Sequence, residues 1–267
     1  MSSPIKSLGI RTELMLRSFE GSVEYKPEYA VIRTPQNPGY RWGNYLSFYR
    51  PPEPGDLERW KALFKQELGE LNHLVFGWDT QTGERGAAQE FVDAGFWLDE
   101  TVVQTAKVVK PPRTLNTACV CRPFNSDEDW AQWLELAMYQ NSVLPEDERE
   151  GEGYATFLER RIAEYGRMIA AGWGDWFGAF VDGRLAASMG LFVRDGLGRF
   201  QSVDTHPDFR RQGMAGTLLY HVARYGFEEL GAKDLVILAD QNYFAKDLYQ
   251  SVGFEPTERT IGLEWSK

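Results

Sequence analysis

The residue types best suited to chemistry stand together in one short loop, Arg210-Arg211-Gln212-Gly213-Met214-Ala215-Gly216. An apolar run ending at Pro207 predicts a strand before this loop, and a helical pattern from Met214 predicts a helix after it. The small residues leave the backbone uncovered, the arginines add positive charge, and the helix start adds the positive end of its dipole. A pyrophosphate needs these features together. The loop therefore predicts a diphosphate site, with a tight turn and two solvated arginines as the alternative.

The residues around the loop resemble a known family. Val203-x-Thr205-x-Pro207-x-x-Arg210-x-x-Gly213-x-Ala215 is similar to the acetyl-coenzyme A (acetyl-CoA) motif of the GCN5-related N-acetyltransferases (GNAT). The family's next motif is resembled by Asn242, Ala245, Leu248-Tyr249 and Gly253-Phe254. The resemblance covers residues 114–267. It implies an enzyme that transfers acetyl from acetyl-CoA directly to a primary amine of a small-molecule or peptide acceptor.

The resemblance also implies roles for single residues. The backbone of Val203 and Thr205 would pair with the pantetheine arm like an added strand. Tyr249 would protonate the departing thiolate, or it is a packed core aromatic. Asn242 would contact the cofactor, or it caps the following helix. The expected cofactor contacts are Val203, Thr205, Arg210, Arg211, Gln212, Gly213, Met214, Ala215, Gly216 and Asn242.

A general base is harder to assign from the sequence. The family often carries a glutamate on the strand before the loop, where this chain has Arg199, Gln201 and Ser202. Asp204 is the nearest carboxylate, and it either takes the proton or is a solvated or turn-bonding residue. An already neutral amine, or transfer through water, needs no such base. The acidic loop 146–152 lies where the family's acceptor often enters, and it either selects a cationic amine or is simply solvated.

Periodic segments predict the elements that position this loop. A Ser126 cap opens a helix, a second helix follows, and two Asp-Gly turns join three strands into an antiparallel meander. The order predicts an α/β fold with a mixed sheet. The expected strands are 116–121, 176–181, 185–194, 199–205, 235–239 and 257–265, and the last two helices are 214–230 and 243–252.

The first half of the chain repeats part of this pattern. Residues 73–79 parallel 235–240, and residues 87–96 parallel 245–254 at a constant offset. The similarity predicts a duplicated domain, with chance likeness of short segments as the alternative. Lys110-Pro111-Pro112-Arg113 reads as the linker. We therefore expect two tandem acyl-CoA N-acyltransferase (GNAT-like) domains, 1–110 and 114–267.

The first half lacks the residues that predict cofactor binding and catalysis in the second half. Its corresponding loop is Pro51-Pro52-Glu53-Pro54-Gly55-Asp56, where prolines have no N–H groups and the acids repel an anion. Phe91, which has no proton to give, aligns with Tyr249. The sequence thus predicts a degenerate, non-catalytic first domain without a cofactor loop and one active site per chain.

Composition limits the remaining function classes. The 267 residues are 43% hydrophobic, and a net charge of -10 opposes binding to nucleic acid or anionic membranes. No signal peptide or membrane span is evident, so we expect a cytoplasmic monomer or homodimer. Cys119 and Cys121 are expected to be free buried thiols on one strand face, and no metal site is expected. Two alternatives stay open: a non-catalytic acyl-CoA sensor or scaffold, and a biosynthetic enzyme resembling mycothiol synthase.

Overall fold

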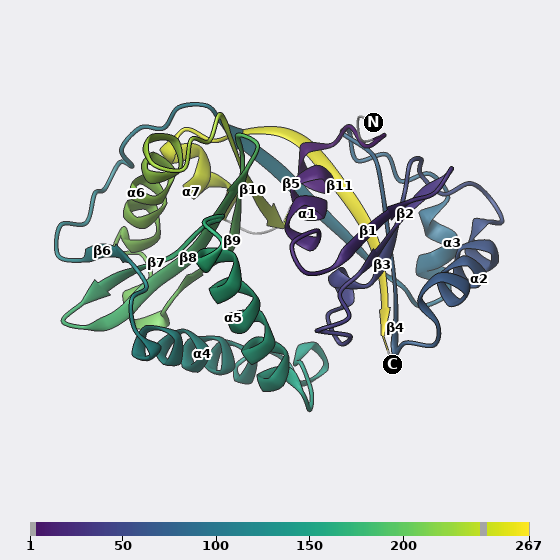
Figure 1. The fold of residues 1–267 in the computed structure, drawn as a ribbon, viewed down its shortest axis with the longest axis horizontal. Helices are drawn as coiled ribbons and strands as arrows, with labels where there is room; N and C mark the ends of the chain where they lie inside the picture. The colour runs from purple at the N-terminus through teal and green to yellow at the C-terminus, as the bar shows by residue number, and fades with distance from the viewer. Residues whose placement is uncertain (1–3, 241–244, 267) are drawn as a thin grey trace. The chain divides into compact units, whose positions relative to one another are not determined.

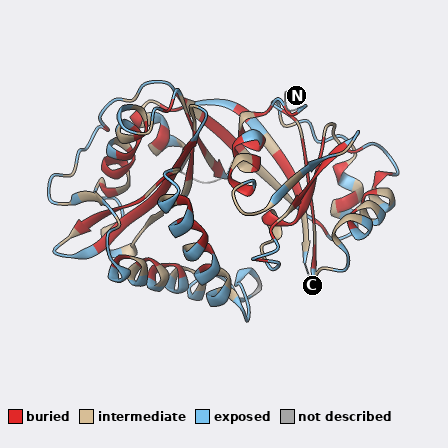
Figure 2. Ribbon diagram, viewed as in Figure 1, coloured by how far each residue is buried: buried red, intermediate tan, exposed pale blue. Residues whose placement is uncertain are grey.

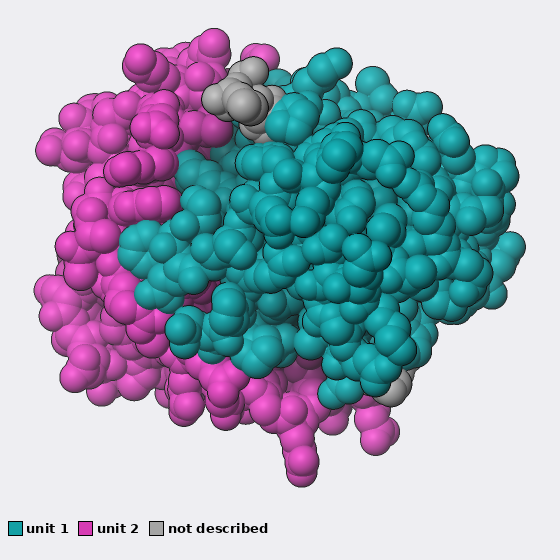
Figure 3. All heavy atoms as spheres, turned by 45° about the vertical axis from the view of Figure 1, so that its right-hand side comes forward, with its two compact units in different colours: residues 1–105, 236–246, 256–267 teal, residues 106–235, 247–255 magenta. Residues whose placement is uncertain are grey.

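The computed structural model describes residues 4–240 and 245–266 (Figure 1). The chain divides into two compact units, which Figure 3 colours separately. Unit 1 comprises Met1–Thr105, Val236–Lys246 and Pro256–Lys267, and unit 2 comprises Ala106–Leu235 and Asp247–Glu255. Among the described residues, no helix has the length and apolar character needed to cross a membrane.

Unit 1 is built on a mixed sheet in the order β1-β2-β3-β4-β11-β5-β10. The neighbours β3 and β4 are parallel, whereas β1–β2, β2–β3 and β4–β11 are antiparallel. Its elements are α1 (Leu8–Arg17), β1 (Ser22–Tyr25), β2 (Tyr29–Arg33), the 3-10 turn η1 (Arg41–Gly43), β3 (Tyr45–Phe48), α2 (Asp56–Leu68), β4 (His73–Trp78), α3 (Ala88–Asp93), β5 (Trp97–Ala106), β10 (Asp234–Asp240) and β11 (Glu255–Ser266).

The core of unit 1 is aromatic. Trp60 and Phe64, four residues apart on α2, are both fully buried against the sheet. The indole of Trp60 stacks on Phe48, with ring centroids 3.7 Å apart. Phe91 of α3 joins the same cluster. The position that aligns with Tyr249 is therefore filled by a ring that packs in the core.

Unit 2 is a four-stranded antiparallel sheet in the order β9-β8-β7-β6, with helices on both faces (Figure 1). Helices α4 and α5 cover one face and α6 covers the other, and their buried sides face the strands (Figure 2). The elements are β6 (Val120–Pro123), α4 (Asp127–Ser142), η2 (Glu146–Glu148), α5 (Tyr154–Ala170), β7 (Gly174–Val181), β8 (Arg184–Arg194), β9 (Leu197–Thr205), η3 (Pro207–Phe209), α6 (Met214–Glu228) and α7 (Ala245–Val252).

Local sequence explains the meander and the first helix. Asp182 and Asp195 have φ of 50° and 53°, and each precedes a glycine that also has positive φ, as two-residue hairpin turns require. The Ser126 side chain accepts a hydrogen bond from the Asp129 N–H, which confirms the expected cap of α4. The mixed α/β architecture expected from the sequence is confirmed.

The first strand of unit 2 is shorter than the sequence suggests. β6 begins at Val120, and not at residue 116, because Asn116 turns the chain: its side chain accepts a hydrogen bond from the Ala118 N–H. Cys119 consequently precedes the strand and only Cys121 lies on it. Both cysteines are free, and they are half-buried where full burial was expected.

The last strand connects to the first half of the chain. β11 pairs antiparallel with β4 over six positions, from Ile261 opposite Trp78 to Ser266 opposite His73. Unit 1 therefore includes residues that the sequence assigned to a domain at 114–267. An alternating pattern shows that a strand is half-buried, but it does not identify the strand's neighbour.

Candidate active site

The start of α6 presents unpaired backbone N–H groups. Gly213 occupies the N-cap position with φ of 80°, and no side chain caps the helix. Within the described residues, nothing accepts a hydrogen bond from the N–H groups of positions 213–216. Arg211 also has positive φ, at 59°. An uncapped helix start that follows left-handed residues forms a concave anion site.

Hydrogen bonds to carbonyl groups hold this loop in place and leave its N–H groups free. The Asn116 side chain donates to the Gln212 carbonyl at 2.8 Å, and the Asn116 N–H donates to the Thr217 hydroxyl at 2.8 Å. The Gln212 side chain donates to the Asp208 carbonyl at 2.7 Å. A Cβ atom added to Gly213 would lie 2.9 Å from the Thr114 carbonyl oxygen. The segment 114–116 thus braces the loop, whereas a strand was predicted to begin at residue 116.

The strand before the loop is interrupted by a bulge. On β8 and β9, Ser188 lies opposite Asp204 but Gly190 lies opposite Gln201, so β9 carries one extra residue. Ser202 has φ of 42° at this point. A bulge takes backbone groups out of the regular ladder and re-aims the side chains that follow. Val203 and Thr205 come after the bulge, at the end of the strand that leads into the loop.

Contacts at both ends fix the helix that carries Tyr249. Leu248 of α7 lies against the first turn of α6, since a Cβ on Gly216 would be 3.1 Å from its Cδ1 atom. At the other end, the Phe254 ring packs on Phe200 of β9, with centroids 5.8 Å apart. Tyr249 itself is only 4% exposed. Asn242, the remaining expected cofactor contact, lies outside the described residues.

Asp204 faces the helices α4 and α5. Its carboxylate is half-buried and accepts a hydrogen bond from the Gln140 side chain of α4. Burial raises the pKa of Asp204 to about 6, although Gln140 and Arg210 both act in the opposite direction. Burial also raises the pKa of Tyr154 on α5, and the negative charges of Glu150 and Asp204 add to that effect. No sequence pattern indicated Gln140 or Tyr154, because neither belongs to the motif.

Arg199 and Gln201 do not supply a base. Arg199 is buried, and a guanidinium stays protonated at any ordinary pH. The Gln201 side chain donates to the Phe200 carbonyl at 2.9 Å. Of the residues considered on this strand, only Asp204 carries a titratable carboxylate.

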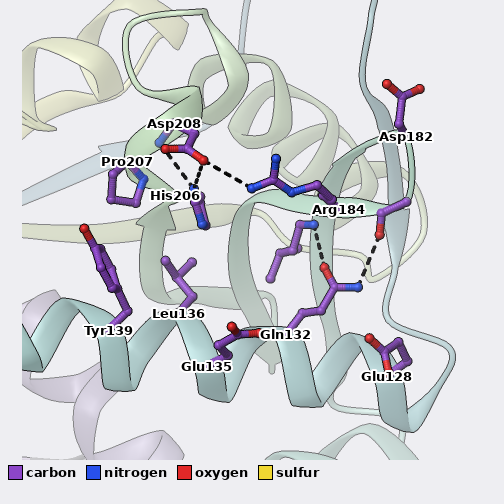
Figure 4. Close-up of a pocket in the computed structure, with 12 residues that line it drawn as sticks. Glu128, Gln132, Glu135, Leu136, Tyr139, Asp182, Arg184, His206, Pro207 and Asp208 are labelled. Atoms are coloured by element: carbon purple, nitrogen blue, oxygen red, sulfur yellow. Dashed lines mark hydrogen bonds and ion pairs between the residues drawn. The ribbon is translucent and has the colours of Figure 1, made fainter.

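A polar pocket of about 650 Å³ lies between α4, the β7–β8 turn and η3 (Figure 4). Arg184 forms an ion pair with Asp208 at 3.2 Å, and the His206 Nδ1 atom accepts a hydrogen bond from the Asp208 N–H. With this arginine paired, the other carboxylates of the lining favour a cation over an anion. The pocket is lined by Glu128, Gln132, Glu135, Leu136, Tyr139, Asp182, Gly183, Arg184, Leu185, His206, Pro207 and Asp208.

Those side chains of the acidic loop that the structure describes do not line this pocket. Glu146 and Glu148 lie on η2 and are exposed. The nearby backbone is held by the Asn141 side chain, which bonds both to the N–H and to the carbonyl of Glu150. Among the described residues there is also no cluster of three or more potential metal ligands.

Comparison with known proteins identifies the part of the chain that carries this site. Residues 130–254 match the family described as "Acetyltransferase (GNAT) family". This segment is similar to the GNAT family. It contains β9, the loop and Tyr249, so the GNAT resemblance of these residues is confirmed. Members of this family use acetyl-CoA as cosubstrate.

Solved structures share the fold over most of the chain. A conserved protein of unknown function from Staphylococcus epidermidis is 13% identical, covers 93% of this chain and 95% of its own, and gives a TM-score of 0.67. A GCN5-related N-acetyltransferase from Kribbella flavida is 15% identical, covers 98% and 96%, and gives a TM-score of 0.61. A tandem GNAT protein from the clavulanic acid biosynthesis pathway is 13% identical, covers 79% and 68%, and gives a TM-score of 0.54. No curated protein matches the sequence.

Proposed function

We propose that the protein is an acetyl-CoA-dependent N-acetyltransferase that acetylates a primary amine of a small-molecule or peptide acceptor. The uncapped start of α6 is the observation that carries the proposal. Its free N–H groups and the positive end of the helix dipole suit a diphosphate, and the neighbouring arginines add charge. The GNAT match of residues 130–254 supports the same cosubstrate.

In this proposal, acetyl-CoA supplies an activated thioester, and the chain binds and orients it. The backbone of Val203 and Thr205 pairs with the pantetheine arm, and the loop at 210–216 binds the diphosphate. The Tyr249 hydroxyl gives a proton to the departing thiolate. A buried phenol suits this role, because a hydrogen bond donated to a developing anion is stronger where water is excluded. Transfer is direct from thioester to amine.

We further infer that unit 1 descends from a second GNAT-like domain and has lost cofactor binding. The Gly55 N–H at the start of α2 donates to the Glu90 carboxylate at 3.0 Å, and the Glu53 N–H donates to Asp56 at 2.9 Å. The chain's own carboxylates therefore accept hydrogen bonds from two of the N–H groups that remain there.

The experiment is an acceptor screen with acetyl-CoA, reading free thiol and product mass across primary amines. The wild-type chain should acetylate at least one of them, and Tyr249→Phe should lower kcat by about 10-fold to 100-fold with unchanged acetyl-CoA affinity. Tyr25→Phe, at an exposed tyrosine of unit 1, is the matched control. Binding without turnover of any amine would instead favour an acyl-CoA sensor.

A further inference from the structure

We propose that Asp204 is the general base of this site: it holds the ammonium group of a cationic acceptor and removes its proton. This inference rests on the proposed acetyltransferase function. It assigns the base to a residue that faces α4 and α5, and it defines the acceptor as an amine that binds in its charged form.

Position is the first argument. Asp204 lies on β9 just after the bulge at Ser202, between Val203 and Thr205. Side chains alternate along a strand, so Asp204 points to the opposite face from Val203 and Thr205. That face is covered by α4, whose Gln140 bonds to Asp204. A carboxylate here lies on the face of the sheet opposite to α6.

The second argument is an unpaired buried hydroxyl beside it. Ser188 lies directly opposite Asp204 in the β8–β9 register, so both side chains project from the same face of the sheet. Ser188 is fully buried, and within the described part of the chain its Oγ atom has no hydrogen-bond partner. Buried polar groups normally have partners, and an orphan next to a carboxylate indicates that a polar ligand or water completes the site.

The third argument is the local charge. The groups that face Asp204 are Gln140 from α4, Tyr154 from α5 and Arg210 from the loop. Burial outweighs the stabilising effects of Gln140 and Arg210, and the pKa of Asp204 is raised to about 6. This value makes the carboxylate ionised at neutral pH, and it makes it a stronger base than an exposed aspartate.

The reaction balances with the groups that are present. The acceptor binds as R–NH3+, and Asp204 takes one proton to leave an amine with a free lone pair. The nitrogen attacks the thioester carbonyl, a C–N bond forms and the C–S bond breaks. Tyr249 gives its proton to the departing sulfur and becomes a phenolate. The second proton of the nitrogen passes to this phenolate, which restores the Tyr249 hydroxyl. Asp204 then returns its proton to water.

The bordering pocket fits a cationic acceptor. Tyr139, which precedes Gln140 on α4, and His206, two residues after Asp204, both line the pocket. Glu135 contributes a further carboxylate to that lining (Figure 4). An acceptor with a second positive group could extend into this space.

The test is the pH dependence of kcat/KM with acetyl-CoA and simple primary amines: ethylamine, phenethylamine, 1,4-diaminobutane and lysine. In the wild type, kcat/KM should rise to a plateau above about pH 6, because the ionised carboxylate and the charged amine are then both present. Asp204→Asn should lower kcat/KM about 100-fold at neutral pH. The remaining kcat/KM of this variant should rise steadily as the pH approaches the pKa of the amine, because only the neutral amine then reacts. Asp195→Asn, at an exposed turn, is the matched control.

Gln140→Leu provides a second variant that keeps the base. The variant loses the Gln140 hydrogen bond, which lowers the pKa of Asp204. The acid limb of kcat/KM should therefore move to higher pH, while its plateau is retained. If the wild type turns over an amine, but Asp204→Asn keeps both the rate and the acid limb, the inference is wrong and the acetyltransferase function stands. Turnover of none of the amines would overturn the proposed function and this inference together.

Discussion

Two helix starts in this chain have the same backbone geometry and opposite surroundings. α2 follows β3 with Gly55 at the N-cap at φ of 86°, and α6 follows β9 with Gly213 at the N-cap at φ of 80°. Gly55 and Gly213 are separated by the same number of residues as Gly95 and Gly253. Neither helix has a side-chain cap. The comparison shows that the same left-handed glycine geometry begins two helices whose neighbouring residues differ.

The difference lies in which N–H groups exist and what they bind. Pro51, Pro52 and Pro54 remove donors before α2, and the Gly55 N–H is bonded to Glu90. At α6 the loop has no proline, and Leu248 stands at the position that aligns with Glu90. An apolar neighbour leaves the donors of α6 for an external anion. The same helix entry is thus satisfied internally in unit 1 and available in unit 2.

The largest expected effect comes from the glycine at α6. Gly213→Glu should weaken acetyl-CoA binding by more than about 100-fold, because it adds a carboxylate at the anion site and strains a left-handed position. Isothermal titration calorimetry measures this. The comparison pair is Gly213→Ala and Gly55→Ala. Each should cost about 1–2 kcal/mol of unfolding free energy because alanine disfavours the left-handed conformation. Gly213→Ala should cost more, since its Cβ atom would lie 2.9 Å from the Thr114 carbonyl oxygen whereas Gly55 has open space around it. Only Gly213→Ala should also weaken binding. Equal affinity in both alanine variants would remove the distinction between the two helix starts.

A smaller effect on acetyl-CoA binding is expected when the carboxylate of Glu90 is introduced at the aligned position of unit 2. Leu248→Glu places an acid where Glu90 stands in the first half. It should compete for the N–H groups of α6 and weaken acetyl-CoA binding about 10-fold, within the range of a charge-assisted hydrogen bond. Leu248→Gln, which has a similar shape and no charge, separates this competition from lost packing. Similar losses in the two variants would show that packing alone is responsible.

The smallest effect concerns Arg211. Arg211→Gly removes a positive charge and also relieves the backbone strain of an arginine in the left-handed conformation. We expect the acetyl-CoA dissociation constant to rise about 3-fold to 10-fold, more at low ionic strength, since exposed charges are screened by salt. The free energy of unfolding should rise by about 0.5–1 kcal/mol, because relief of the left-handed arginine outweighs the entropy that a glycine adds to the unfolded chain. Arg224→Gln, at the far end of α6 beside Glu228, should leave binding unchanged. A salt-independent loss in Arg211→Gly would argue against an electrostatic role.

The sequence predicted the features that depend on local chemistry. The Ser126 cap, the Asp-Gly turns and the motif at 203–215 each follow from residue types at short spacing, and the cap, the turns and the family of the motif are confirmed. The pairing of β11 with β4 was not predictable, since strand patterns do not name their partners. Neither were Gln140, Tyr154 and Ser188, which reach Asp204 only through tertiary packing. The position of Gly55 at a helix N-cap could have been predicted, because Gly55 aligns with Gly213 at the constant offset.

The central claim is that one helix start in this chain binds acetyl-CoA and the other does not. Calorimetric titration of the intact wild-type chain with acetyl-CoA tests this most directly, since it reports stoichiometry as well as affinity. The account predicts one molecule bound per chain, lost in Gly213→Glu and kept in Gly55→Ala. Two molecules per chain, or binding that survives Gly213→Glu, would contradict it.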